Sequence, residues 1–142
     1  MKFTSLNTPE FIVRALETKN IAECTEIQKE VIPLLSEDKD VIGQSKTGSG
    51  KTFAYAIPAA EKVDTESGDT QILVCPTREL AAQVVNEIRF LNTFREGCKV
   101  VPVFGGTNMA RQVTTLKKNA EIVVGTPGRL VDHLKRRTLK LE

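Results

Sequence analysis

The sequence has little from which a metal site or a disulfide framework could be built. Its three cysteines, Cys24, Cys75 and Cys98, form no CxxC pair and are odd in number, and His133 is the only histidine. The composition therefore argues against both kinds of site. Reduced cysteines are typical of cytosolic proteins.

Long apolar runs are also missing. No stretch approaches the length of a membrane span, and the N-terminus lacks the basic segment followed by an apolar run that marks a signal peptide. We therefore expect no membrane partner and a cytoplasmic location. With 142 residues, of which 40% are hydrophobic, the chain fits one soluble globular domain with a core of ordinary size.

The chain as a whole has little excess of positive over negative charge, but its second half has a clear excess of basic residues. The net charge of +2 is too small to indicate a nucleic-acid partner by itself. From Lys99 onward, however, nine basic residues are accompanied by three acidic ones. Either a surface that binds nucleic acid or ordinary solvated helix faces would give this distribution.

The chain reads as a series of apolar strands that are each followed by a helix. Thr8 as cap and Pro9 as first residue predict one helix, and Thr25 begins a second. Apolar runs predict strands at Val41–Gly43, Ile72–Cys75, Val100–Phe104 and Ile122–Val124. Helical spacing predicts helices at Phe53–Val63, Glu79–Leu91, Met109–Lys118 and Pro127–Arg137, the last capped by Thr126.

Unbroken apolar strands that alternate with helices are typical of a parallel sheet covered on both faces. The pattern therefore predicts an α/β fold. The polar segment Asp64–Thr70 separates two of these repeats and is predicted to be an exposed loop.

The segment Ser45–Thr52, SKTGSGKT, matches the phosphate-binding loop of nucleotide hydrolases, except that Ser45 stands at the pattern's first glycine. Glycines let backbone N–H groups turn toward an anion, and the following helix adds its positive N-terminal end. Lys51 would contact the β- and γ-phosphates of ATP, and Thr52 would supply a hydroxyl to Mg²⁺. The alternative is a turn that merely links a strand to a helix.

We predict that the whole loop binds nucleotide and that its last two residues, Lys51 and Thr52, are catalytic. The predicted nucleotide-binding residues of the loop are Ser45, Lys46, Thr47, Gly48, Ser49, Gly50, Lys51 and Thr52.

Three further motifs follow the other predicted strands: PTRELAAQ at Pro76–Gln83, the pair Gly105–Gly106, and TPGR at Thr126–Arg129. Together with SKTGSGKT, and in the same order and spacing, they resemble the DEAD-box family of ATP-dependent RNA helicases over the whole chain. The resemblance implies a RecA-like P-loop fold, with ATP and Mg²⁺ as cofactors. It also implies that residues 1–36 form an adenine-recognition segment and that residues 37–142 are part of the first helicase domain.

In that family adenine is recognised by a glutamine within a short motif, helped by an aromatic residue upstream. Asn20–Gln28 resembles this motif, so Gln28 and Phe3 fill the two positions. The motif departs from the family pattern at Asn20, Ile21, Cys24 and Glu26, and Ile21 cannot stack on a base as an aromatic ring would. Gln28 could instead complete a capping box with Thr25, and Phe3 could be a core residue.

The resemblance further implies that single-stranded RNA binds where the strands end. The predicted RNA-binding residues are Pro76, Thr77, Arg78, Gly105, Gly106, Thr126, Pro127, Gly128 and Arg129. Arginines and helix N-termini would hold phosphates, and glycines would let the backbone approach closely. Binding should then tolerate sequence and be sensitive to salt. Taken singly, each arginine could equally form a surface ion pair.

None of the predicted strands ends in the carboxylate that hydrolysis of ATP requires. The resemblance places the Asp-Glu-Ala-Asp segment after Glu142 and a second RecA-like domain beyond it. We therefore expect weak nucleotide and RNA binding by these 142 residues without turnover, and self-association through an open strand edge. Two other functions stay open: a non-catalytic nucleotide- or RNA-binding module, and a P-loop ATPase that acts on DNA or protein.

Overall fold

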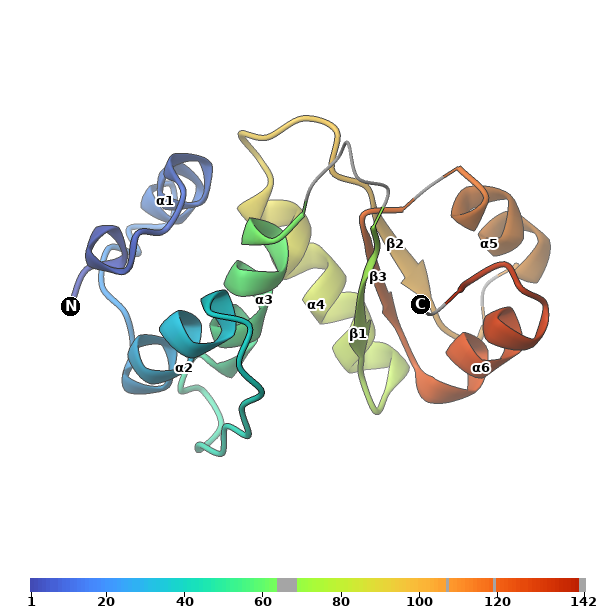
Figure 1. Cartoon of the computed structure of the whole chain (residues 1–142), viewed down its shortest axis with the longest axis horizontal. Coiled ribbons are helices and arrows are strands. Elements are labelled where there is room, and N and C mark those ends of the chain that lie inside the picture. The colour runs from blue at the N-terminus through green and yellow to red at the C-terminus, as the bar shows by residue number, and fades with distance from the viewer. Residues whose placement is uncertain (64–68, 107, 119, 141–142) are drawn as a thin grey trace. The chain divides into compact units, whose positions relative to one another are not determined.

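The computed structural model describes residues 1–63, 69–106, 108–118 and 120–140. The elements follow in the order η1 (Phe3–Leu6, a 3₁₀ helix), α1 (Glu10–Glu17), α2 (Glu26–Ser36), α3 (Lys51–Glu61), β1 (Gln71–Val74), α4 (Arg78–Leu91), β2 (Val100–Val103), α5 (Met109–Leu116), β3 (Ile122–Gly125) and α6 (Pro127–Lys135) (Figure 1). Most of the loop predicted at Asp64–Thr70 lies outside the described residues.

These elements belong to two compact units. The first comprises Met1–Lys62 and Glu87–Glu96, and the second comprises Val63–Asn86 and Gly97–Glu142. Helix α4 therefore contributes its N-terminal part to the second unit and its C-terminal part to the first. No helix among the described residues is long and apolar enough to span a membrane.

The second unit contains a three-stranded parallel sheet in the order β1-β3-β2. Val123 of β3 lies opposite Ile72 of β1 and Val101 of β2. Strand β3 is buried along its whole length, which explains why its sequence is an unbroken apolar run rather than an alternating one. The predicted parallel α/β arrangement is therefore confirmed.

Helices α5 and α6 lie on the same side of this sheet (Figure 1). Leu116 of α5 and Leu130 of α6 belong to a buried cluster with Val101, Val103 and Val123 of the strands. Because both helices are fastened to the sheet by apolar packing, the polar residues at their N-terminal ends have fixed positions where the strands finish.

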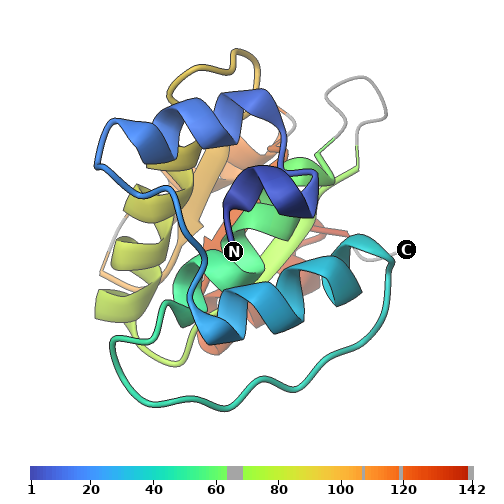
Figure 2. The same cartoon turned by 90° about the vertical axis from the view of Figure 1, so that its left-hand side faces the viewer.

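The segment Val41–Gly43 is not a strand, although its apolar run predicted one. It lies in a long loop that runs past α2 before it enters α3 (Figure 2), and the side chain of Ile42 is 100% exposed. A strand needs a neighbour to accept its backbone hydrogen bonds, and the strands of the described residues pair only with one another, in the order β1-β3-β2. Local apolar character was therefore not enough to make a strand.

The predicted helices are all present, with small differences at their ends. Helix α1 begins at Glu10 with Pro9 as its cap, so the prediction of Thr8 as cap was wrong by one residue. The Thr8 hydroxyl is buried and has no hydrogen-bond partner within the described part of the chain. Thr126 does occupy the cap position of α6, but its side chain makes no capping hydrogen bond.

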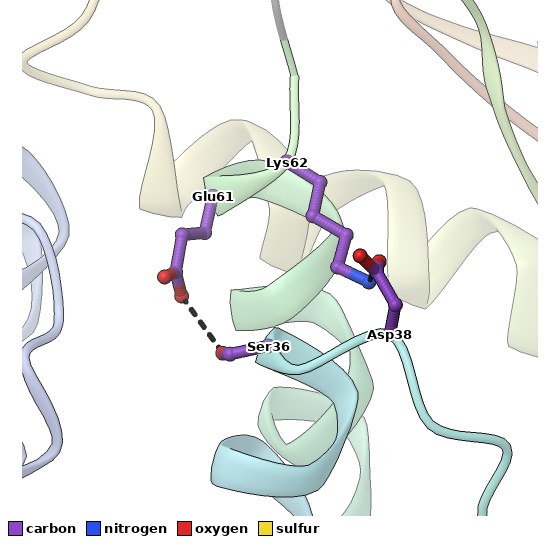
Figure 3. A network of polar contacts seen from close by, with 4 residues as sticks. All are labelled: Ser36, Asp38, Glu61 and Lys62. Atoms are coloured by element: carbon purple, nitrogen blue, oxygen red, sulfur yellow. Dashed lines mark hydrogen bonds and ion pairs between the residues drawn. The ribbon is translucent and has the colours of Figure 1, made fainter.

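Helices α2 and α3 of the first unit pack together and are joined at their C-terminal ends. Figure 3 shows the two polar contacts that join them: Lys62 forms an ion pair with Asp38, and the Ser36 hydroxyl donates to a carboxylate oxygen of Glu61 over 3.3 Å. Since α3 begins at Lys51, within the SKTGSGKT loop, these contacts help to fix the helix that carries the last two residues of that loop.

The C-terminal end of α4 is held to the α1 region by cations placed over aromatic rings. Arg14 lies 4.2 Å from the ring centre of Phe94, and Lys19 lies 4.1 Å from that of Phe90. Such contacts contribute about 0.5–1 kcal/mol each at exposed sites. They add to the apolar core of the first unit, which includes the buried side chains of Ile12 and Leu16.

Candidate functional site

The SKTGSGKT loop has the backbone conformation that its glycines make possible. Gly48 and Gly50 have φ angles of 82° and 90°, in the left-handed region that favours glycine. The Ser49 N–H donates to the carbonyl of Lys46 over 3.3 Å, which closes a turn. Gly50 is the N-cap of α3, so the free N–H groups of that helix begin within the loop, at Lys51 and Thr52.

Two features of the loop fit an anionic group such as a nucleotide phosphate. The Ser49 hydroxyl is buried and has no hydrogen-bond partner in the described residues, so it is available as a donor. The Lys51 ammonium donates to the carbonyl of Ser45 over 2.6 Å. The lysine side chain therefore spans the loop, and its positive charge lies beside the loop's first residue. A phosphate in the loop would compete with that carbonyl for the ammonium.

Thr52 is the second residue of α3 and is half-buried. No group of three His, Cys, Asp or Glu residues that could hold a metal ion occurs in the ranges that the structure describes. The Thr52 hydroxyl is the side-chain oxygen of the loop that was predicted to contact Mg²⁺, and this role stays a prediction.

Gln28 connects the start of α2 to the loop. Its side-chain oxygen accepts the Thr25 N–H over 3.0 Å, as expected for the predicted capping box, which is present. Its amide nitrogen donates to the Gly50 carbonyl over 3.1 Å, and the side chain is 3% exposed. The capping role of Gln28 is thus confirmed, whereas its recognition of adenine stays a prediction.

Phe3 is buried, with 2% of its surface exposed, and belongs to the core of the first unit. Its N–H donates to the carbonyl of Ala22, inside the Asn20–Gln28 motif. Asn20 has a φ of 58°, in the left-handed region, which asparagine tolerates better than most residues. The structure supports the core role of Phe3 and leaves its contact with adenine a prediction.

A cavity of about 200 Å³ lies beside the loop in the same unit. It is lined by Ile27, Val31, Leu35, Val41, Gly43, Lys51, Ala54 and Tyr55. The lining is apolar apart from Lys51 and Tyr55, so its chemistry does not suit a phosphate.

In the second unit, Arg78 and the double glycine lie together. Arg78 is the first residue of α4, and its guanidinium donates to the Gly105 carbonyl over 3.4 Å. Gly106 has a φ of 83°, and a Cβ atom at this position would collide with the Arg78 guanidinium. Thr77 caps α4 by accepting the Leu80 N–H over 3.2 Å. The PTRELA motif and the double glycine, far apart in sequence, therefore form one surface.

Arg129 is linked through hydrogen bonds to the segment after β2 that Arg78 also contacts. Its guanidinium donates over 3.3 Å to the side-chain oxygen of Gln112, and the amide nitrogen of Gln112 donates over 3.1 Å to the carbonyl of Phe104. Phe104 directly precedes Gly105, to which Arg78 is bonded. The two predicted arginines thus converge on the segment that follows β2. All nine predicted RNA-binding residues are at least partly exposed.

Sequence reasoning missed two residues next to this surface, Gln112 and His133. Both are buried, and the two side chains are hydrogen-bonded to each other. A signal existed for one of them, because His133 follows Arg129 by four residues and therefore lies on the same face of a helix. Burial lowers the pKa of His133, and Arg129 and Arg136 lower it further, whereas Asp132 acts in the opposite direction.

Comparison with known proteins places these motifs in a family context. The family model described as DEAD/DEAH box helicase matches residues 25–142. The chain is 46% identical over 142 residues to the ATP-dependent RNA helicase CshA of Listeria monocytogenes, and 46% identical over 140 residues to the DEAD-box ATP-dependent RNA helicase CshA of Bacillus subtilis. These alignments cover 99% and 98% of this chain but 27% and 28% of the relatives.

Solved structures agree. A DEAD box protein from the hyperthermophile Methanococcus jannaschii superimposes with a TM-score of 0.92 at 44% identity, over 99% of this chain and 39% of that one. A hypothetical ATP-dependent RNA helicase from Sulfolobus tokodaii gives a TM-score of 0.81 at 40% identity, over 92% of this chain and 37% of that one. The predicted RecA-like α/β fold is therefore confirmed, for a chain that spans 27–30% of the length of its curated relatives.

Proposed function

Because the chain belongs to the DEAD/DEAH box helicase family, we propose that it binds ATP with Mg²⁺ at Ser45–Thr52 and single-stranded RNA at the surface formed by Arg78, Gly105–Gly106 and Arg129. The protein that contains it would be an ATP-dependent RNA helicase, the activity named for its relatives. A second RecA-like domain would be its partner in that activity. We also propose a cytoplasmic location and the division into residues 1–36 and 37–142.

The observation that carries the proposal is the conformation of the loop. Left-handed φ angles at Gly48 and Gly50 turn the backbone into the N-terminus of α3, and the buried Ser49 hydroxyl is left without a partner. Helix N-termini and such turns attract anions through N–H groups and the helix dipole. Lys51 adds a full positive charge within reach of the same loop.

Each loop residue would have a distinct task. Lys51 would exchange the Ser45 carbonyl for phosphate oxygens, and the Thr52 hydroxyl would help to hold a Mg²⁺ ion bound with the nucleotide. Bound Mg²⁺ neutralises charge that develops on the phosphates. Gln28 would keep Gly50 in place and, through its remaining N–H and lone pair, could meet the edge of adenine.

The RNA surface is suited to a sugar-phosphate backbone rather than to bases. It combines two guanidinium groups with exposed glycines and with the capped N-terminus of α4. These groups bind phosphate oxygens, which are the same at every nucleotide. We therefore expect binding that tolerates sequence and weakens as salt is added.

Hydrolysis needs carboxylates in addition to these groups. The three strands are followed by Cys75, Phe104 and Thr126, so no described strand presents an acidic residue at its end. We propose that the 142 residues by themselves bind both ligands weakly without turnover. RNA-stimulated release of phosphate by the 142-residue chain would contradict this.

Titration of a fluorescent ADP derivative tests the nucleotide site. Lys51→Ala should weaken binding by about tenfold to a hundredfold, because it removes hydrogen bonds to a charged group. Lys39→Ala is the matched control, since Lys39 is an exposed lysine of the same unit outside the loop. If Lys51→Ala binds as wild type does, the proposed site is wrong.

Two further arms separate the alternatives. Loss of affinity in Lys51→Ala but not in Gln28→Ala would leave Gln28 as a capping residue only. Equal affinity for single-stranded RNA and DNA of the same sequence would favour a P-loop ATPase that acts on DNA.

A further inference from the structure

Two buried polar side chains lie behind the proposed RNA surface and have no place in its predicted set. Gln112 of α5 is 6% exposed and His133 of α6 is 0% exposed. Their hydrogen bonds reach Arg129 and the backbone just before Gly105. Burying a polar group costs folding free energy unless the group is fully hydrogen-bonded. A buried, hydrogen-bonded pair behind the proposed RNA surface therefore points to a role at that surface.

The orientation of the Gln112 amide follows from its neighbours. Arg129 can only donate, and the Phe104 carbonyl can only accept. The amide oxygen must therefore face Arg129, at 3.3 Å, and the amide nitrogen must face Phe104, at 3.1 Å. The reverse orientation would set donor against donor and acceptor against acceptor.

This orientation determines which nitrogen of His133 carries a proton. Nε2 lies 2.9 Å from the Gln112 oxygen, so it must be the donor. In the neutral ring Nδ1 is then an acceptor, so the single hydroxyl proton of Thr138 is donated to Nδ1, at 2.7 Å, in preference to the His133 carbonyl, at 3.2 Å. Both lone pairs of the Gln112 oxygen are thus used, one by Arg129 and one by His133.

We propose that Gln112 and His133 are positioning residues for RNA binding, which hold the Arg129 guanidinium and the Phe104–Gly105 backbone in one fixed relation. His133 orients the Gln112 amide, and the amide connects the TPGR motif to the double-glycine motif. The proposal rests on the proposed function, since it assumes that Arg129 and Gly105 contact the RNA backbone. Neither positioning residue touches RNA itself.

The charges around His133 make its pKa sensitive to a phosphate bound at Arg129. Arg129, Arg136 and Asp132 act on the ring from its own helix and that helix's C-terminal end, while α5 presents the neutral Gln112. A phosphate bound to Arg129 would offset part of the positive charge that lowers the pKa of His133. RNA binding should therefore raise that pKa, although the ring is completely buried.

A double-mutant cycle tests the proposal in the longest form of the protein that is expressed. Arg129→Ala and Gln112→Ala should each weaken binding of a fluorescent single-stranded RNA by about threefold to tenfold, and Gln112→Ala should have a clearly smaller effect in the Arg129→Ala background than in wild type, because only its bond to the Phe104 carbonyl is left to lose. Additive effects of the two changes would overturn the proposal, because they would mean that Gln112 acts independently of Arg129.

Leu116→Ala is the structural control, since Leu116 is buried in the same helix but outside the network. It should lower stability and leave RNA affinity within about twofold at a temperature at which all variants are folded. If Leu116→Ala weakens RNA binding as much as Gln112→Ala does, looseness of α5 explains the loss and the proposal fails.

A second measurement needs no variant. In the 142-residue chain His133 is the only histidine, so the imidazole NMR signals of this chain belong to it alone. They should shift, and titrate at higher pH, when single-stranded RNA is added. Absence of any shift at saturating RNA would overturn the inference.

The same affinities distinguish a failure of the proposed RNA surface from a failure of the proposed positioning role. If Arg129→Ala leaves RNA affinity unchanged, the proposed RNA surface is wrong. If Arg129→Ala weakens binding but Gln112→Ala does not, the surface stands and the positioning role is lost.

Discussion

Gly50 meets two requirements that a residue with a side chain cannot meet together. Its φ of 90° is strained for residues with a Cβ atom, and a Cβ there would collide with the Gln28 amide and lie 2.9 Å from the Thr25 hydroxyl. Gly48 shares the first requirement, with a φ of 82°, but faces open space. Substitution of Gly48 would therefore cause backbone strain alone, whereas substitution of Gly50 would cause both strain and a steric collision.

We predict that Gly50→Ala is more harmful than Gly48→Ala. Both should lose about 1 kcal/mol of stability through strain, and Gly50→Ala should in addition displace Gln28 and weaken nucleotide binding. Chemical denaturation and ADP titration of the two variants measure both effects. Equal losses would show that the contact between Gly50 and Gln28 is unimportant.

At the scale of the element, two threonines occupy the same position with different bonds. Thr25 caps α2 within a capping box that includes Gln28. Thr126 stands at the cap of α6, but its side chain makes no capping hydrogen bond. The sequences already differ, because Gln28 stands three residues after Thr25 and can complete a capping box, whereas Arg129 stands three residues after Thr126.

We expect Thr25→Ala to lower the free energy of unfolding by about 1 kcal/mol, because it removes a cap. Thr126→Ala should change it by less than about 0.5 kcal/mol. Urea denaturation followed by circular dichroism provides the comparison. A larger loss for Thr126→Ala would contradict the hydrogen bonding of the two caps.

At the scale of the whole molecule, one buried group should govern stability near neutral pH. Histidine is the only side chain whose ordinary pKa, about 6.5, lies in this range, and the chain has one. Burial lowers the pKa of His133 in the folded state. Below pH 6.5 the unfolded chain therefore takes up a proton that the folded chain resists.

The free energy of unfolding should consequently be highest above pH 6.5 and fall as the pH drops toward the lower pKa of the folded state. Denaturation midpoints between pH 7.5 and 5.5 measure this, and His133→Gln should flatten the profile. Stability that is constant or rises on acidification in wild type would contradict the burial of a neutral ring.

Self-association of the chain through an open strand edge stays a prediction. β1 lies at an edge of the sheet, and its residue Val74 is 62% exposed. An edge of this kind can pair with another chain.

Local spacing determined much of this protein. The SKTGSGKT loop and the capping box of Thr25 and Gln28 could be predicted because each depends on residues close in sequence. The three strands could be predicted because each lies in an apolar run, although their pairing joins distant residues. The same spacing predicted a strand at Val41–Gly43, which was wrong, because a strand also depends on a neighbour that the sequence does not specify.

Only the tertiary structure decided which distant residues meet. The contact of Arg78 with Gly105, the close approach of the Arg78 guanidinium to Gly106, and the link from Arg129 through Gln112 to Phe104 all join segments of different elements. Sequence alone showed His133 as a single histidine on a helix. Its burial against Gln112 became visible once α5 and α6 were packed on one side of the sheet, because hydrogen bonding between helices depends on their packing rather than on spacing along the chain.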